Sequence, residues 1–115
     1  MDRVEKLTQQ KKEILKQIAQ LPAMRRGSVT EQYLDFTRKD GSKTKRGPYR
    51  VYSFKVKDKT VSSRLRNKQE EKLYRRQIEA FRRFQQLTAE LARIGHELAD
   101  LVVAEQAEEK KTSRH

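Results

Sequence analysis

Few side chains in this sequence suit catalysis, and those few are scattered. Asp35, Asp40 and Asp58 fall in predicted turns or at strand ends, whereas a metal-dependent nuclease needs several carboxylates that converge on one ion. The chain contains no cysteine and two histidines, so we expect neither a disulfide framework nor a cysteine-containing zinc site. We therefore predict a non-enzymatic protein with no metal and no cofactor.

A larger set of side chains suits the binding of a polyanion. Lys and Arg side chains can pair with phosphates or contact guanine edges, and hydroxyl side chains can donate hydrogen bonds to phosphate oxygens. Both kinds recur through the middle of the chain. The residues predicted to bind nucleic acid are Arg25, Arg26, Arg38, Lys39, Lys43, Lys45, Arg46, Ser53, Lys55, Lys57, Ser62 and Arg64.

The predicted binding residues come from three parts of the chain. Arg25 and Arg26 precede the first predicted strand and resemble an arm that reaches a flanking groove. The basic residues between 38 and 46 belong to a predicted loop that would follow the nucleic-acid backbone. The remaining five are expected on one face of an antiparallel sheet, which can enter the major groove of duplex DNA. The alternative is that this face is only solvated, as one side of an antiparallel sheet often is.

The charge of the chain is concentrated in its middle. The net charge is +12, and residues 22–64 hold twelve basic and four acidic side chains, whereas residues 84–115 hold four and six. A concentrated basic region is typical of proteins that bind polyanions. Hydrophobic residues make up 34% of the chain and charged residues 38%, so a wide globular core is not expected. Long helices with narrow apolar seams fit this composition.

The stretch from Tyr52 to Leu65 separates apolar from basic residues as a β-hairpin would. With Asp58-Lys59 as a two-residue turn, Val56 pairs with Val61 and Tyr52 pairs with Leu65. Strand alternation then gives an apolar face of Tyr52, Phe54, Val56, Val61 and Leu65, interrupted by Ser63. The opposite face carries Ser53, Lys55, Lys57, Thr60, Ser62 and Arg64. A slip of one residue would destroy this separation, so the pattern predicts one buried face and one basic face.

The remaining strands and loops follow from β-branched residues and turn signals. Ser28–Phe36 and Tyr49–Val56 are predicted strands, and Thr60–Leu65 is a third. Between the first two, residues 38–48 are predicted to form a long loop, with Asp40-Gly41 as a turn and Gly47-Pro48 as a second break.

Helical periodicity appears at both ends of the chain. Val4, Leu7, Ile14, Ile18 and Leu21 form one apolar seam, which Pro22 ends. A long helix is predicted from about Asn67 to about Glu108, with a heptad seam from Phe84 to Leu101. Its aromatic, basic first half is expected to pack under the sheet, and its leucine-rich second half is expected to pair with the first helix. Pairing between two chains, which would give a homodimer through the C-terminal helix, is the alternative.

The predicted fold class is therefore α+β. A small three-stranded antiparallel sheet lies between a short N-terminal helix and a long C-terminal helix, and the two helices pair as an antiparallel coiled-coil stalk. The predicted segments are 1–21 for the N-terminal helix, 22–66 for the basic sheet, 67–109 for the long helix and 110–115 for a frayed tail.

Several short motifs resemble an uncharacterised family of small prokaryotic proteins. They are LPAMRRGSV at Leu21–Val29, RGPY at Arg46–Tyr49, KVKDKTVSSRL at Lys55–Leu65 and the following IEAFRRFQQL. That family typically has Leu-Pro-x-Met-x-x-Gly-Ser, a cysteine-bearing knuckle, His-Gly-Pro-Tyr, a Lys-Thr hairpin and a long helix. This chain lacks the knuckle cysteines and has Arg46 in place of the histidine. The family's frequent association with mobile elements implies a lean toward DNA. The order of sheet and helix is also similar to the DNA-binding domains of some tyrosine recombinases.

These observations predict a nucleic-acid-binding protein, with duplex DNA favoured as its ligand, that contacts phosphates and a groove through a basic sheet face. An adaptor that binds an acidic protein partner, and an RNA or ribosome binder, share the same electrostatics and remain alternatives. No run of apolar residues approaches the roughly 20 that span a bilayer, so no membrane association is expected. The expected location is the cytoplasm, including the nucleoid.

Overall fold

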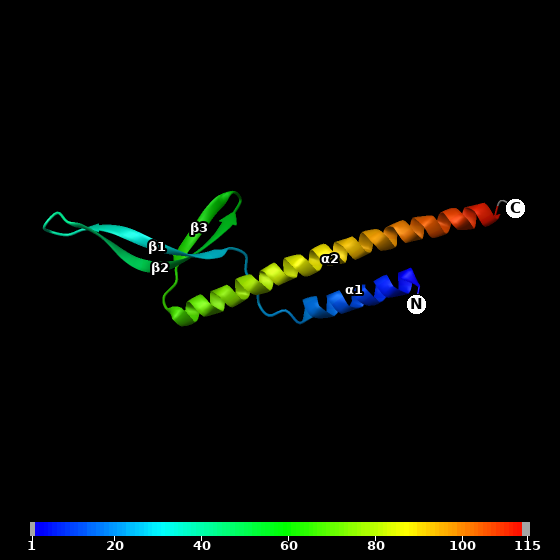
Figure 1. Ribbon diagram of the computed structural model, residues 1–115, viewed down its shortest axis with the longest axis horizontal. Helices are drawn as coiled ribbons and strands as arrows, with labels where there is room; N and C mark the ends of the chain where they lie inside the picture. The colour runs from blue at the N-terminus through cyan, green and yellow to red at the C-terminus, as the bar shows by residue number, and fades with distance from the viewer. Residues whose placement is uncertain (1, 114–115) are drawn as a thin grey trace. The chain divides into compact units, whose positions relative to one another are not determined.

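The computed structural model describes residues 2–113, with side chains described for residues 2–109. The elements follow the order α1 (Arg3–Ala19), β1 (Ser28–Thr37), β2 (Lys43–Val56), β3 (Lys59–Arg64) and α2 (Lys68–Ser113), as Figure 1 shows. The predicted α+β class and element order are confirmed. No helix in the described part of the chain combines the length and the apolar character that a bilayer crossing requires.

The chain forms two compact units, and α2 contributes to both. Of the described residues, 2–21 and 82–113 make a helical unit, whereas 22–81 make a sheet unit. The division falls inside α2, so the predicted segment 67–109 is one helix with two separate packing partners. The helix also continues to Ser113, so residues 110–113 are helical rather than the predicted tail, and residues 114–115 lie outside the described residues.

In the helical unit, α1 packs antiparallel to the second half of α2. Leu7 and Ile14 of α1 form a buried cluster with Leu87 and Ile94 of α2. Arg3, at the start of α1, pairs with Glu97 at 2.7 Å, and the Arg83 guanidinium donates to the Gln17 side chain at 2.8 Å near the other end of α1. This order of partners establishes the antiparallel direction. The predicted pairing of the two seams within one chain is confirmed, and their packing as a regular coiled coil stays a prediction.

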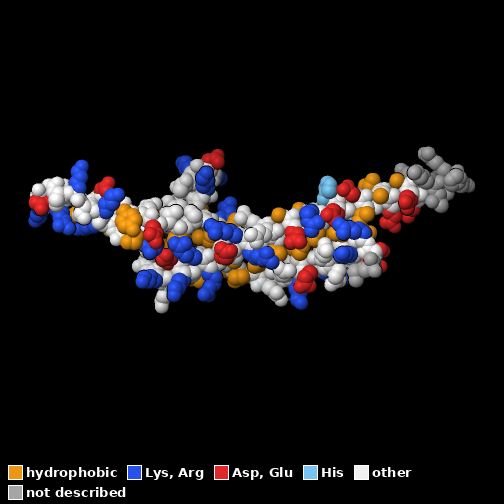
Figure 2. Space-filling model, in the orientation of Figure 1, with side chains coloured by type: hydrophobic (Ala, Val, Ile, Leu, Met, Phe, Trp, Pro, Cys, Tyr) orange, Lys and Arg blue, Asp and Glu red, His pale blue; other side chains and the backbone are white. Residues whose placement is uncertain are grey.

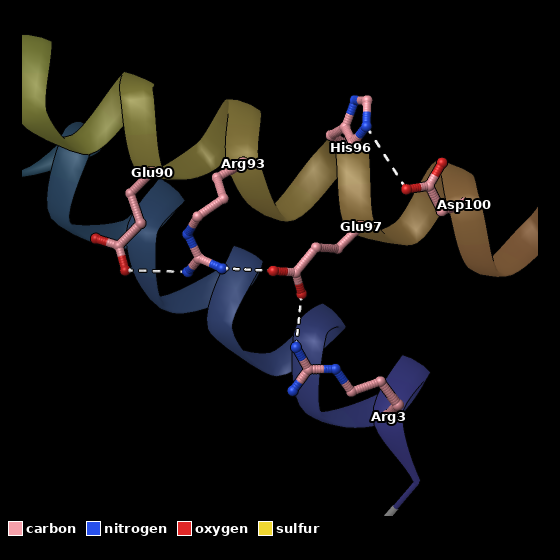
Figure 3. Close-up of polar contacts among 6 residues, drawn as sticks. All are labelled: Arg3, Glu90, Arg93, His96, Glu97 and Asp100. Atoms are coloured by element: carbon pink, nitrogen blue, oxygen red, sulfur yellow. Dashed lines mark hydrogen bonds and ion pairs between the residues drawn. The ribbon is translucent and has the colours of Figure 1, made fainter.

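Exposed ion pairs border this helix pair (Figure 3). Glu97 accepts from Arg3 of α1 and also from Arg93, one turn earlier on α2, at 2.8 Å. His96 lies 3.5 Å from Asp100, and both side chains are exposed. Exposed pairs contribute about 0 to 1 kcal/mol each, so the buried leucine and isoleucine side chains supply most of the stability here.

In the sheet unit, one face of the sheet packs on the first half of α2. The sheet is antiparallel in the order β1-β2-β3. Tyr52 of β2 and Leu65 form a buried cluster with Ile78 of α2, and Tyr74 packs against it. This confirms the prediction that the aromatic first half of the long helix lies under the sheet. Asn67 caps the helix, because its side chain accepts a hydrogen bond from the Glu70 N–H at 2.8 Å.

The predicted register of the β2–β3 hairpin is wrong, because the turn lies one residue earlier in the chain than predicted. The two-residue turn is Lys57-Asp58 rather than Asp58-Lys59, so Val56 pairs with Lys59 and Phe54 pairs with Val61. Both turn residues have positive φ, 49° and 67°, as the tight turns that match strand twist require. Moving the turn by one residue changes each partner by two positions along β3. The two faces are therefore kept, because side chains alternate with a period of two.

The predicted loop of residues 38–48 is also wrong in extent. β2 begins at Lys43, so only residues 38–42 connect the strands, and the remainder pairs with β1. The tight connection is held by Asp40, whose side chain accepts from the Ser42 N–H at 2.9 Å and from the Ser42 hydroxyl at 2.6 Å. Gly47 and Pro48 interrupt the pairing opposite Tyr33 without ending the strand. A proline is tolerated in a strand at such an irregularity, because no ladder donor is needed there.

Candidate nucleic-acid interface

The face of the sheet opposite Tyr52 is open, and we call it the open face. It is defined by strand alternation and the observed register. None of its side chains is buried, whereas Tyr52 on the other face is 5% exposed. The open face comprises Ser28, Thr30 and Gln32 of β1, Tyr49, Val51, Ser53 and Lys55 of β2, and Thr60, Ser62 and Arg64 of β3.

Hydroxyl side chains form a row across the middle of the open face. Ser28 pairs with Ser53, which pairs with Ser62, so the three strands each contribute a serine. The Ser53 and Ser62 hydroxyl oxygens lie 2.8 Å apart and share a hydrogen bond. Each hydroxyl still has capacity to bond an external oxygen, because a hydroxyl offers one donor and two acceptor positions. The row therefore suits a ligand that presents several oxygens.

Two predicted cations border the hydroxyl row. Lys55 is exposed and pairs with Thr60 on the side of the row nearer the β2–β3 turn. Arg64 lies on the opposite side of the row, where its guanidinium carbon stands 3.7 Å from the centre of the Tyr49 ring. Stacking on a ring holds the guanidinium plane in place and leaves its edge N–H groups free for an anion. Ser53, Lys55, Ser62 and Arg64 are thus brought together on one face.

Lys57 is not on the open face, which corrects its predicted position. It occupies the β2–β3 turn with φ 49°. Its exposed side chain lies at the end of the hairpin, next to the row formed by Lys55 and Thr60. The new register also puts Lys59 opposite Val56, on the same face as Tyr52.

The outer part of the β1–β2 hairpin carries five further predicted cations. We call residues 34–46 the distal ribbon. Its two strands pair from Leu34 with Arg46 to Thr37 with Lys43, and Figure 2 shows basic side chains gathered at its tip, at the left of the view. Every one of these cations is exposed. They are Arg38, Lys39, Lys43, Lys45 and Arg46.

Within the distal ribbon the cations divide between its two sides and its tip. Arg46 lies 3.7 Å above the Phe36 ring, while Lys43 and Lys45 pair with Thr37 and Asp35 on the other side. Asp40 stands at the tip, where the Ser42 hydroxyl and then the Ser42 N–H hold the pKa of its carboxyl below the usual value. The ribbon is therefore a paired structure with cations on both sides, whereas the sequence predicted a loop.

Arg25 is engaged inside the sheet unit, and this corrects the predicted free arm. Its guanidinium donates to the Gln77 side chain at 2.6 Å and lies 3.9 Å from the Tyr74 ring centre. The Arg25 N–H also donates to the Gln77 carbonyl at 3.2 Å. The carbonyl of Arg26 accepts from the Tyr52 hydroxyl, although its side chain is exposed. Arg26 therefore stays accessible to a ligand, while Arg25 joins the strand entry to α2.

Sequence reasoning missed Arg66 and Lys68, which lie where β3 leads into α2. Together with Arg64, which was predicted to bind, and with Pro48 and Tyr49, they line a hollow of about 490 Å³. Arg50 also lines it and is held by two carboxylates, Glu31 at 3.1 Å and Glu71 at 3.0 Å. The sequence shows basic residues on either side of Leu65. The hollow that they line forms only because the chain turns from β3 into α2 at this point.

Two further observations concern metal sites and similarity to known proteins. Among the described side chains, those of residues 2–109, no group of three His, Asp or Glu is placed to hold a metal ion. The three aspartates singled out in the sequence lie in separate places: Asp35 in the distal ribbon, Asp40 at its tip and Asp58 in the β2–β3 turn. Comparisons with protein-family models, with curated proteins and with solved structures found no match to this chain.

Proposed function

We propose that this protein binds nucleic acid, with duplex DNA as its preferred form, and that the open face is the contact surface. The proposal rests mainly on the difference between the two faces of one sheet: aromatic residues of one face pack on α2, while hydroxyl and basic side chains of the other face solvent. The resemblance to a family associated with mobile elements supports the preference for DNA.

Electrostatics support the proposal. Residues 22–81 hold seventeen Lys and Arg against seven Asp and Glu, which is +10 of the total of +12. Several of the carboxylates are engaged by arginines within the unit, as Glu71 is by Arg50 and Arg75. Lys55 and Arg64 have no carboxylate partner among the described residues. Such cations are available to neutralise phosphates and release counterions.

Shape supports duplex DNA over a flat or globular partner. The major groove is about 12 Å wide and admits a two-stranded β-ribbon, and strands lie about 4.8 Å apart. The β2–β3 hairpin presents Lys55, Ser62 and Arg64 along such a ribbon. In this arrangement the hydroxyl row meets the backbone, and the distal ribbon's cations follow the same duplex. An A-form RNA helix has a narrow major groove, which the hairpin would not enter.

A titration tests the proposal directly. Duplex DNA, single-stranded DNA and RNA of one sequence are added to the protein at two salt concentrations, with light scattering to give the mass. We expect duplex DNA to bind most tightly and binding to weaken with salt. Binding of RNA alone would assign the protein to the alternative RNA or ribosome class. Absence of binding to all three near physiological salt would remove the proposal and leave the adaptor class.

A charge variant locates the contact. Lys55→Ala, Arg64→Ala and Lys57→Asn are combined, with asparagine chosen because it tolerates the positive φ at position 57. We expect duplex affinity to fall by at least about tenfold, because each lost phosphate contact removes counterion release. The matched control carries Lys6→Ala, Lys12→Ala and Lys16→Ala, three exposed residues of α1 in the helical unit. Equal losses in both variants would show that total charge, rather than the open face, sets the affinity.

A further inference from the structure

The hollow at the β3–α2 junction differs from the open face in being concave. It has a volume of about 490 Å³, and Pro48 and Tyr49 form its apolar wall. Basic side chains line it from three directions: Arg50 from β2, Arg64 from β3, and Arg66 with Lys68 from the turn into α2. Glu71 is the one acidic residue of its lining.

The backbone that carries these cations is held in place. Leu65 is 6% exposed in the core of the sheet unit, and its N–H donates to the Arg50 carbonyl at 2.8 Å. Arg64 and Arg66 flank Leu65 in the chain, so both leave the backbone at fixed points. The Arg64 guanidinium is stacked on Tyr49, which is part of the wall. Cations with restricted motion lose less entropy when they bind an anion.

The donors of the hollow are only partly used within the protein. Arg50 is held by two carboxylates, Glu71 through Nε and Glu31 through a terminal guanidinium nitrogen, and Arg66 is paired through Nε with Glu70. Lys68 and Arg64 have no carboxylate partner among the described residues. The Glu70 N–H at the start of α2 is already taken by the Asn67 cap. The cationic side chains that line the hollow are the donors that we consider for an anion.

We infer that this hollow binds a phosphate monoester at the end of a nucleic-acid strand, which rests on the proposed function and deepens it. A nucleic-acid strand that continues across the sheet would pass over a concave site, whereas the end of a nucleic-acid strand can project into it. A terminal monoester carries about −1.5 to −2 charges, more than a backbone diester, and offers three acceptor oxygens. Arginine forks and a lysine that line one hollow match that charge, and a guanidinium can bond two of those oxygens at once. Tyr49 and Pro48 provide an apolar surface for the terminal sugar.

The test compares internally labelled duplexes of one sequence that end in a 5′-phosphate, a 3′-phosphate or hydroxyls only. We expect the full chain to bind one of the phosphorylated duplexes about tenfold more tightly than the hydroxyl duplex, as charge-assisted contacts would give. The double variant Arg66→Ala with Lys68→Ala should lose this preference to within about twofold and keep its affinity for the hydroxyl duplex. The matched control, Lys72→Ala with Arg76→Ala, removes the same charge from exposed positions of α2 and should keep the preference.

The outcomes separate this inference from the proposed function. Equal binding of all three duplexes would overturn the strand-end site and leave nucleic-acid binding intact, whereas no binding at all would overturn both. A preference that survives in the hollow variant, with its fold verified by circular dichroism, would place the monoester elsewhere and also overturn the inference. Free phosphate is the other ligand with this chemistry, so binding of inorganic phosphate is measured as well. If the hollow binds inorganic phosphate and the protein shows no preference among the duplexes, the hollow is a free-phosphate site and the inference is overturned.

Discussion

Ile94 has no exposed surface, and Leu91, one turn earlier on α2, is half-buried. Both belong to the heptad seam that the sequence displays. Their different burial comes from the position of α1, which the seam alone does not specify. Replacing either residue therefore perturbs the fold of the helical unit to a different degree.

We predict that Ile94→Ala lowers the free energy of unfolding by about 2 to 5 kcal/mol, because it removes a fully buried side chain and leaves a cavity. Leu91→Ala should cost less than Ile94→Ala, since part of that side chain already contacts water. Urea denaturation followed by circular dichroism measures both. Equal costs would contradict the packing described for α1. A loss of function in these variants would thus report on folding and would not identify an adaptor surface.

Asp40 provides a prediction on pH. Its folded-state pKa lies below the ordinary value of 3.8, because the Ser42 hydroxyl and N–H bond the ionised carboxyl. The stabilisation of the ribbon tip is therefore fully present above the ordinary pKa and is lost as the pH falls through the folded pKa. Ser42→Ala removes the larger cause and should raise the pKa of Asp40 toward its ordinary value. A carboxyl titration by NMR measures the shift, and an unchanged pKa would rule out the hydroxyl as its cause.

At the scale of elements, the sequence predicted the strands and helices well and their junctions less well. The faces of the β2–β3 hairpin followed from alternation, but the turn was misplaced because Lys57-Asp58 lacks the glycine or asparagine that usually signals positive φ. The distal ribbon was missed because Gly47-Pro48 reads as a break in a single sequence. The structure shows the pair as an irregularity opposite Tyr33.

The candidate site was predictable where it depends on side-chain alternation and was missed where it depends on tertiary contact. Ser53, Lys55, Ser62 and Arg64 share a face because strands alternate. Arg25 was assigned to an arm, since its contact with Gln77 joins residues far apart in the sequence. The hollow at the β3–α2 junction likewise requires the direction in which the chain enters α2.

Two glycines of the sheet unit should respond differently to a methyl group. Gly27 has φ +119°, and an added Cβ would clash with the Ser53 carbonyl and lie 2.9 Å from the Tyr52 ring. Gly41 has φ +86° with no atom within 4 Å of its added Cβ. We predict that Gly41→Ala costs about 1 to 3 kcal/mol from backbone conformation alone. Gly27→Ala should cost more, because steric overlap adds to the backbone cost. Thermal unfolding of both variants tests the order, and equal costs would contradict it.

At the scale of the whole molecule, one unit holds most of the positive charge. Residues 22–81 carry +10, and the remaining residues carry +2. The helical unit's described apolar seam is occupied within the chain by α1, with Leu7 and Leu87 at 1% and 2% exposure. The homodimer through the C-terminal helix stays a prediction, and light scattering in the titration checks it.

Salt dependence gives a prediction for the molecule as a polyelectrolyte. The logarithm of the binding constant should fall linearly with the logarithm of salt concentration, with a slope of about −0.9 for each neutralised phosphate. The variant that changes Lys55, Lys57 and Arg64 should reduce the magnitude of that slope by about 2 to 3. The control variant in α1 should change it by less than about 1. A slope that is the same in all three proteins would exclude phosphate contacts by the open face.

The period-two alternation of the β2–β3 hairpin also bears on how this protein could diverge. Moving its turn by one residue leaves both faces intact, because each partner changes by two positions. A hairpin that is longer or shorter by one residue on each strand at the turn therefore keeps one apolar and one polar face. A lone insertion within one strand would interchange the two sides beyond it unless a bulge absorbed the extra residue, as β2 does at Gly47-Pro48. We therefore expect insertions and deletions in this hairpin to change its length by an even number of residues or to create such a bulge.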